Sequence, residues 1–218
     1  MSELGRVLVD DVVDFHAQHR LVPVVVVDSV DRALPLAETL SGCGLPSAEV
    51  TLRTPDALAV ISAMAAHSGF VVGAGTVVRP EQVEQALSAG ARYVVSPGYS
   101  AAVDRECRRL DVLLVPGVAT ATELQTALDA GRDVVKLFPA AVVGGAGMVA
   151  ALSAPFPSAR FVPTGGITAH DLSDYLRLPA VLAVGGTWLA PRDVVDSGDF
   201  ERVARETSAA TALVEQLR

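Results

Sequence analysis

Residues 120–137 read TATELQTALDAGRDVVKL, and they hold one complete repeat of the expected fold. Thr120 and Glu123 have the spacing of a capping box, which predicts the start of a helix. The apolar residues that follow keep to one helical face, and Gly131 is typical of a helix end. Val134–Leu137 then has the length and the β-branched content of a buried strand. The stretch therefore predicts a helix that leads back into a parallel sheet.

Short β-branched runs of this kind alternate with helical segments along the whole chain. There are eight of them: Leu21–Val27, Ala48–Leu52, Phe70–Val72, Tyr93–Ser96, Val112–Val115, Val134–Leu137, Arg160–Pro163 and Val181–Val184. Eight strand–helix units predict an α/β protein with a single (β/α)8 (TIM) barrel. An open, doubly wound sheet is the alternative, but it usually has fewer strands and a glycine-rich fingerprint after the first one. The first run ends Val27-Asp28-Ser29, which favours the barrel.

One domain is expected over residues 1–218, with the barrel core at 21–190. The flanking segments are predicted to be an extra N-terminal helix within residues 1–20 and a C-terminal helix within residues 191–218. The N-terminal helix is expected to share one apolar face among Val9, Val12, Val13 and His16. Within the core, Thr54-Pro55-Asp56 predicts a helix that Thr54 caps.

The composition narrows the classes of partner. Half of the residues are hydrophobic, which suits a parallel sheet buried on both faces. The longest uncharged apolar-rich stretch, Leu137–Leu152, is too short and too interrupted by glycine and proline to span a membrane. The net charge of −8 argues against a nucleic-acid partner.

The N-terminal sequence and the small number of cysteines predict a cytoplasmic protein. The N-terminal sequence MSELGRVLVDDVVDF lacks the basic start and the apolar core of a signal peptide. Cys43 and Cys107 are too few for a disulfide framework and are expected to be inert packing residues.

Lys136 stands out because the chain has sixteen arginines and only this one lysine. Arginine stays protonated and cannot act as an amine nucleophile, whereas lysine can. Lys136 lies in the apolar strand DVVKLFP, which suits a desolvated amine better than a solvated cation. Active sites of barrels form at the C-terminal ends of the strands, where this lysine is placed. The alternative is an inward lysine that only pairs with a carboxylate.

Glu49 is the second candidate, since glutamate is disfavoured in strands. If it points into the mouth of the barrel, it faces Lys136 and relays protons as a general acid and base. The alternative is a structural ion pair with Lys136 or Arg53.

Two glycine pairs, Gly165-Gly166 and Gly185-Gly186, close the seventh and eighth predicted strands. Barrels often bind phosphate at this position through backbone N–H groups. Thr187 is placed to add a hydroxyl. The pairs therefore predict a phosphate site, with tight turns as the alternative.

No metal site is expected. The four histidines are His16, His19, His67 and His170. They lie on predicted helices or at their edges and lack the spacing of metal ligands, and most of them are expected to be solvated. This argues against a metal-dependent mechanism.

From Leu21 to Leu189 the chain resembles the 2-keto-3-deoxy-6-phosphogluconate (KDPG) aldolases, also called 4-hydroxy-2-oxoglutarate (KHG) aldolases. The resemblance rests on eight motifs in order: VPVVVV, EVTLRTPDAL, GAGTV, VVSPG, PGVATATEL, VKLFPA, FVPTGGI and AVGGTWL. It implies a class I aldolase that needs no cofactor, takes a 2-keto acid or a phosphorylated sugar acid, and forms a homotrimer.

The resemblance also implies roles for single residues. Lys136 matches the lysine that forms the Schiff base, and Glu49 matches the general acid and base. The residues that match substrate-binding positions are Arg53 and Thr76 for the pyruvate carboxylate and keto group, Pro97 and Phe138 for the walls, Thr164 for gluconate-type stereochemistry, and Gly165, Gly166, Gly185, Gly186 and Thr187 for the phosphate.

Three other interpretations stay open at this stage. One is a phosphogalactonate-type aldolase of the same family. Another is a phosphate-binding barrel enzyme that acts without an imine, which leaves Lys136 unexplained. The last is a diverged barrel that binds a ligand or partner without catalysis.

Overall fold

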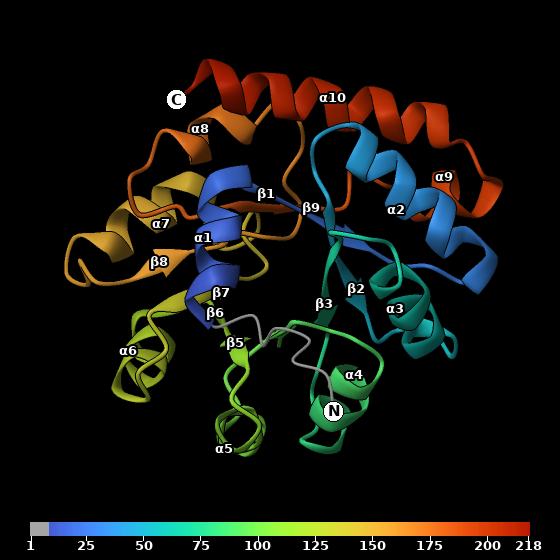
Figure 1. Ribbon diagram of the computed structural model, residues 1–218. Coiled ribbons are helices and arrows are strands. Elements are labelled where there is room, and N and C mark those ends of the chain that lie inside the picture. The colour runs from blue at the N-terminus through green and yellow to red at the C-terminus, as the bar shows by residue number, and fades with distance from the viewer. Residues whose placement is uncertain (1–8) are drawn as a thin grey trace.

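The computed structural model describes residues 9–218, in which parallel strands form a closed ring inside a ring of helices (Figure 1). The strands are β1 (Leu21–Val25), β2 (Ser47–Thr51), β3 (Val71–Gly75), β4 (Tyr93–Val95), β5 (Leu113–Val115), β6 (Gly117–Val118), β7 (Val134–Leu137), β8 (Arg160–Phe161) and β9 (Val184–Gly186). None of the helices in this part of the chain is long and apolar enough to cross a membrane.

The ring closes through two short junctions. Six strands pair in the order β5-β4-β3-β2-β1-β9, and the other three pair as β6-β7-β8. Only Pro116 separates β5 from β6, and its carbonyl accepts a hydrogen bond from the Lys136 amide of β7. Parallel bridges from Phe161 to Val181 and from Thr164 to Gly185 join the chain around β8 to the chain around β9. Counted as one strand, β5 and β6 bring the barrel to eight strands. The predicted (β/α)8 barrel is therefore confirmed.

Two strands differ from their predicted bounds at the C-terminal end. Strand β3 continues through Gly75, beyond the predicted end at Val72. Strand β9 begins at Val184, where the predicted strand Val181–Val184 ends, and continues through Gly186. Glycine is unfavourable in strands, but here it is required by close packing. A Cβ at Gly186 would lie only 1.7 Å from the Trp188 ring. The first strand is shorter than predicted, since β1 ends at Val25.

The predicted helix boundaries are confirmed for α6 and wrong at Thr54. Helix α6 begins after Thr120, whose hydroxyl accepts the Glu123 amide, and Gly131 follows its end with φ 68°. Thr54, in contrast, does not cap a helix. Its hydroxyl donates to the Val27 carbonyl at 2.9 Å, so the helix begins at Ala57 instead. The cap prediction was wrong because this hydroxyl finds a better-placed acceptor across the barrel rim.

Eight helices surround the strands (Figure 1). They are α2 (Ala33–Gly42), α3 (Ala57–Ala65), α4 (Glu81–Ser88), α5 (Ala101–Arg109), α6 (Ala121–Asp129), α7 (Gly145–Ser153), α8 (Leu172–Leu176) and α10 (Phe200–Gln216). A 3-10 turn, η1 (Val30–Arg32), precedes α2, and the short helix α9 (Arg192–Ser197) precedes α10. The C-terminal segment thus holds two helices instead of one.

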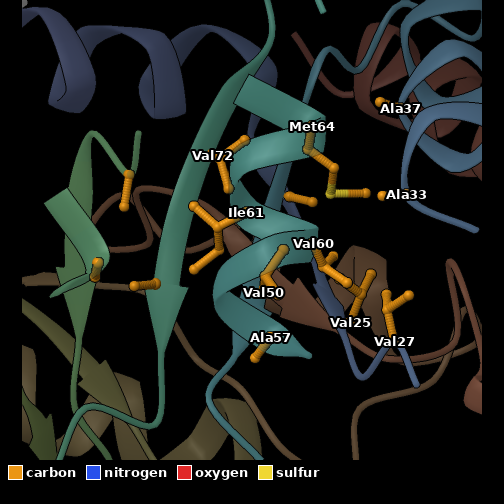
Figure 2. Close-up of a cluster of buried hydrophobic side chains, with 14 of the residues drawn as sticks. Val25, Val27, Ala33, Ala37, Val50, Ala57, Val60, Ile61, Met64 and Val72 are labelled. Carbon is orange, nitrogen blue, oxygen red and sulfur yellow. The ribbon is translucent and has the colours of Figure 1, made fainter. Parts of the chain in front are cut away.

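The outer core lies between the strands and this ring of helices. Figure 2 shows α3 packed on the sheet, with Ile61 against Val72 of β3 and Val60 toward Val25 and Val27. Met64 reaches from α3 toward Ala33 of α2. All of these side chains are at most 1% exposed. This packing holds the strand ends rigid, which fixes the positions of any groups placed there.

The predicted N-terminal helix is present as α1 (Val9–His19), and the part of that prediction covering residues 1–8 lies outside the described residues. Its buried residues, Val12 and His16, pack on barrel residues near the N-terminal ends of their strands, such as Tyr93 and Leu113. The His16 ring meets the Tyr93 ring edge-on, with centroids 4.8 Å apart. Helix α1 therefore covers the N-terminal end of the barrel.

His16 predicts an acid sensitivity of the fold. Burial, with a smaller contribution from His19, lowers the pKa of His16 from 6.5 to about 4. Between these values the unfolded chain takes up a proton that the folded chain refuses, so stability falls as the pH drops. Urea unfolding should lose about 2 kcal/mol between pH 7 and pH 5 from this group. His16→Met should lack this loss, and His170→Gln, at an exposed position, should retain it. Equal pH profiles for wild type and His16→Met would contradict the assignment.

Candidate active site

A buried ion pair joins the two residues that the sequence singled out. Lys136 Nζ of β7 lies 2.9 Å from Glu49 Oε1 of β2. The two residues are only 5% and 2% exposed. Charged groups are rarely buried this deeply unless they are paired, because each loses its hydration. The barrel therefore brings a lysine and a carboxylate together in its solvent-shielded interior.

Gly75 makes room for the Glu49 carboxylate. A Cβ at Gly75 would lie 2.3 Å from Glu49 Oε1, so the carboxylate rests on the bare backbone of β3. The sequence analysis included Gly75 in the GAGTV motif but gave it no role of its own. The signal that could have found it is a glycine where a strand continues, which often marks a close approach.

Phe138 lies next to the ion pair. Lys136 Nζ is 5.5 Å from the centroid of the Phe138 ring, which is within the range of a cation–π contact. Gly165, with φ 99°, lies under the same ring, since a Cβ there would be 3.1 Å from two ring carbons. Phe138 therefore forms one wall beside the amine, and Gly165 leaves room for its ring.

The two glycine pairs meet at neighbouring strand ends. A parallel bridge joins Thr164 to Gly185, and a Cβ at Gly185 would lie 2.2 Å from Thr164 Oγ1. Gly166 has φ 75°, which favours glycine. Gly185 and Gly186 belong to β9 and form no turn, so the turn interpretation is wrong for this pair.

Backbone donors remain free at this junction. Among residues 9–218, no group accepts a hydrogen bond from the amides of Gly165, Gly166 or Thr187. Thr187 follows β9 and is exposed. The Thr164 hydroxyl is buried and donates to the Val162 carbonyl at 3.3 Å. Unused amides next to an exposed hydroxyl are the donors that a phosphate group needs.

The remaining predicted residues lie at strand ends, outside the hydrogen bonds of the ion pair that the described residues show. Arg53 is exposed in the turn after β2, Thr76 follows β3 with φ 58°, and Pro97 follows β4. The Pro97 carbonyl lies against Gly117, where a Cβ would be 2.1 Å from the carbonyl oxygen. Within the described part of the chain, no hydrogen bond or ion pair connects the side chains of Arg53 and Thr76 to Lys136 or Glu49.

The histidines and cysteines do not gather into a metal site. In residues 9–218, no group of three or more His, Cys, Asp or Glu side chains has a suitable arrangement. Three histidines are at least partly exposed, whereas His16 is buried. Burial raises the pKa of the Cys107 thiol to about 12, which makes it a poor nucleophile.

Comparisons with known proteins agree with this geometry. The sequence profile of the KDPG and KHG aldolase family matches residues 12–206. A 2-dehydro-3-deoxy-phosphogluconate aldolase of Treponema pallidum (strain Nichols) is 45% identical over 185 residues, which is 84% of this chain and 88% of that protein.

Two solved structures have similar folds. The KDPG aldolase of Legionella pneumophila, with pyruvate captured as a covalent carbinolamine intermediate, superposes with a TM-score of 0.87 at 36% identity and covers 91% of this chain and 97% of its own. The KDPG aldolase of Zymomonas mobilis ZM4 with 3-phosphoglycerate has a TM-score of 0.87 at 37% identity, covering 94% and 96%.

The family match, together with the buried lysine–glutamate pair inside a (β/α)8 barrel, makes this chain a carbon–carbon lyase of the class I aldolase type. The chain belongs to the KDPG and KHG aldolase family.

The ion pair predicts a coupled loss of stability. Lys136→Met should lower the free energy of unfolding by about 3–5 kcal/mol, because it leaves the buried Glu49 carboxylate unpaired. The double variant Lys136→Met/Glu49→Gln should recover part of this loss, since no unpaired charge remains. Urea unfolding of the four proteins in the cycle measures the coupling.

Arg109→Met is the matched control, because Arg109 pairs with Glu106 at the surface. Its urea midpoint should equal that of the wild type. Additive losses in the Lys136–Glu49 cycle would contradict a coupled pair.

Proposed function

We propose that this protein cleaves 2-dehydro-3-deoxy-6-phosphogluconate into pyruvate and glyceraldehyde 3-phosphate through a Schiff base on Lys136. The observation that carries the proposal is the 2.9 Å contact of a buried lysine amine with a buried carboxylate. The covalent carbinolamine captured in the Legionella relative supports the same chemistry for the family.

The reaction begins when the Lys136 amine, after giving up a proton, attacks the keto carbon of the substrate. Glu49 Oε1 is placed to accept that proton, because it already contacts Nζ. The first adduct is a carbinolamine, and its hydroxyl leaves as water when a proton is returned. The product is a protonated imine, which attracts electrons far more strongly than the original ketone.

The protonated imine allows cleavage of the C3–C4 bond, because it accepts the electrons of that bond. Glu49 removes the proton from the C4 hydroxyl, and the electrons of the C3–C4 bond flow into the imine. Glyceraldehyde 3-phosphate leaves, and the pyruvate half stays on Lys136 as an enamine. Glu49 returns a proton to C3, and water hydrolyses the resulting imine to release pyruvate. Glu49 thus acts as base and then as acid in turn, and it ends the reaction in the protonation state in which it began.

The other substrate-binding roles rest on the family resemblance together with position. Arg53 and Thr76 are proposed to hold the carboxylate and the keto group, and Pro97 and Phe138 to line the pyruvate half. All four lie at the C-terminal ends of strands, where barrel enzymes bind their substrates. Thr164 is proposed to favour the gluconate-type stereochemistry.

The phosphate is proposed to bind where the two glycine pairs meet. The amides of Gly165, Gly166 and Thr187 have no other acceptor within residues 9–218, and the Thr187 hydroxyl is exposed. Gly185 and Gly186 lie beside them in β9. Charge-assisted hydrogen bonds from these groups would hold a dianion without any lysine.

A second substrate is 4-hydroxy-2-oxoglutarate, which would yield pyruvate and glyoxylate. It is favoured by the family match, whose description names both substrates. The pyruvate half would meet the same Lys136 and Glu49. A barrel that acts without an imine or without catalysis is disfavoured, because it gives no reason to bury a lysine–glutamate pair.

We also propose that the protein is a cytoplasmic homotrimer, as the family resemblance and the free cysteines suggest. Sedimentation velocity should give the mass of three chains.

Trapping of the imine tests the central proposal. Incubation with pyruvate and borohydride should leave a reduced pyruvyl group on Lys136, located by mass spectrometry of peptides. Lys136→Arg should acquire no adduct and should lose nearly all cleavage of the phosphorylated substrate, since arginine cannot form the imine. Near-normal turnover by Lys136→Arg would contradict the proposal.

Thr187→Val tests the phosphate site. Loss of one hydrogen bond to a charged group should raise KM for the phosphorylated substrate by about tenfold. KM for 4-hydroxy-2-oxoglutarate should stay unchanged, because that substrate has no phosphate. Thr211→Val, on the outer helix α10, is the matched control and should leave both constants as in the wild type. Equal effects of Thr187→Val on both substrates would argue against phosphate binding there.

A further inference from the structure

A basic hollow lies at the end of the barrel opposite to the two glycine pairs. It is open to solvent, has a volume of about 540 Å³, and is lined by three arginines together with apolar residues. Arg20 directly precedes β1, Arg160 is the first residue of β8, and Arg177 follows α8. The hollow therefore lies at the N-terminal ends of the strands, away from the groups that the proposed reaction uses.

Positive charge is concentrated in this hollow, although the chain has a net charge of −8. No aspartate or glutamate lines it. A fourth arginine, Arg218, lies close by at the end of α10, which packs beside α8 (Figure 1). Burial, followed by repulsion from Arg218 and Arg160, lowers the pKa of Arg20 below its usual value. A concave surface lined by one sign of charge focuses its field into the solvent and attracts ions of the opposite sign.

Structural roles account for only part of these arginines. Arg20 has a left-handed backbone with φ 58°, and its Nη2 donates to the carbonyls of Leu176 at 2.8 Å and Val181 at 3.3 Å. These bonds fix the guanidinium and leave its Nε and Nη1 without an acceptor among the described residues. The exposed side chains of Arg160 and Arg177 have no hydrogen bond or ion pair within residues 9–218. The hollow thus offers one fixed and two free guanidinium groups.

The groups that line the hollow indicate the class of anion that it fits. The planar guanidinium donates two parallel hydrogen bonds to a phosphate group. Three such groups match several adjacent phosphates better than a single carboxylate. The volume is also within the range of small-molecule sites, which leaves room for an organic group. The apolar part of the lining, which includes Leu178 and Pro179, can cover such a group.

We propose that this hollow is a second anion site, which binds a chain of adjacent phosphate groups apart from the substrate. Arg20, Arg160 and Arg177 donate to the phosphate oxygens, and Leu178 and Pro179 contact an organic group attached to them. Two sources share this chemistry, a nucleoside triphosphate and inorganic polyphosphate. Binding needs neither Lys136 nor Glu49, so the inference does not rest on the proposed aldolase reaction.

Calorimetric titration with ATP and with tripolyphosphate, at low ionic strength and without magnesium, tests the site. Both anions should bind the wild type. Arg160→Met and Arg177→Met should each raise Kd by about tenfold, because each removes charge-assisted hydrogen bonds. Arg105→Met is the matched control, since Arg105 is exposed on α5 and the substitution changes the net charge equally. It should leave Kd as in the wild type, and all three variants should keep the melting temperature.

Thr187→Val separates this site from the proposed substrate phosphate site, and it should bind both anions as the wild type does. Tighter binding of ATP than of tripolyphosphate supports the site with a nucleotide as its source, and equal binding supports it with inorganic polyphosphate. An equal loss in Arg105→Met overturns the inference, because the effect is then one of overall charge. A loss in Thr187→Val with normal binding by Arg160→Met and Arg177→Met also overturns it, as does the absence of binding by the wild type at millimolar concentration.

Discussion

Burial of the Lys136–Glu49 ion pair is the constraint on which the rest of the site depends. Two charges removed from water lose several kcal/mol of hydration each, and only close contact with good geometry offsets the loss. The barrel supplies that geometry by fixing β7 and β2 on opposite parts of one closed ring. A pair held in this way is poised for chemistry, because any change in the bonding of the amine alters the environment of the carboxylate at once.

Glycine is the means by which the barrel makes room for this pair. Gly75 lies under Glu49, Gly73 lies under Tyr93, and Gly165 lies under Phe138. At Gly75 and Gly73 the missing side chain of one strand leaves space for a side chain of the neighbouring strand, and Gly165, after β8, leaves space for Phe138, after β7. The missing side chains of Gly185 and Gly186 likewise leave room for Thr164 and Trp188. The crowded interior of a small barrel thus explains why glycines occur inside strands, where they would ordinarily weaken the sheet.

Sequence reasoning identified the architecture well and the details of its interior poorly. The alternation of valine-rich runs with helical segments predicted the barrel, because burial on both faces leaves a clear signal in a parallel strand. The ends of β3 and β9 and the cap at Thr54 were misplaced, since each depends on contacts between residues distant in sequence. The burial of His16 was missed for the same reason. A polar residue on an amphipathic helix gives no sign of which surface the helix will cover.

The sequence by itself determined the strand–helix repeat, the unusual status of the single lysine, and the set of residues at the strand ends. These follow from local periodicity and from the chemistry of single side chains, which need no partner to be recognised. Only the tertiary structure decided that Lys136 meets Glu49 at 2.9 Å and that Tyr93 and His16 line one cavity with Glu49. The physical reason is that closure of the ring and its register set these contacts, and both depend on the packing of all eight units together.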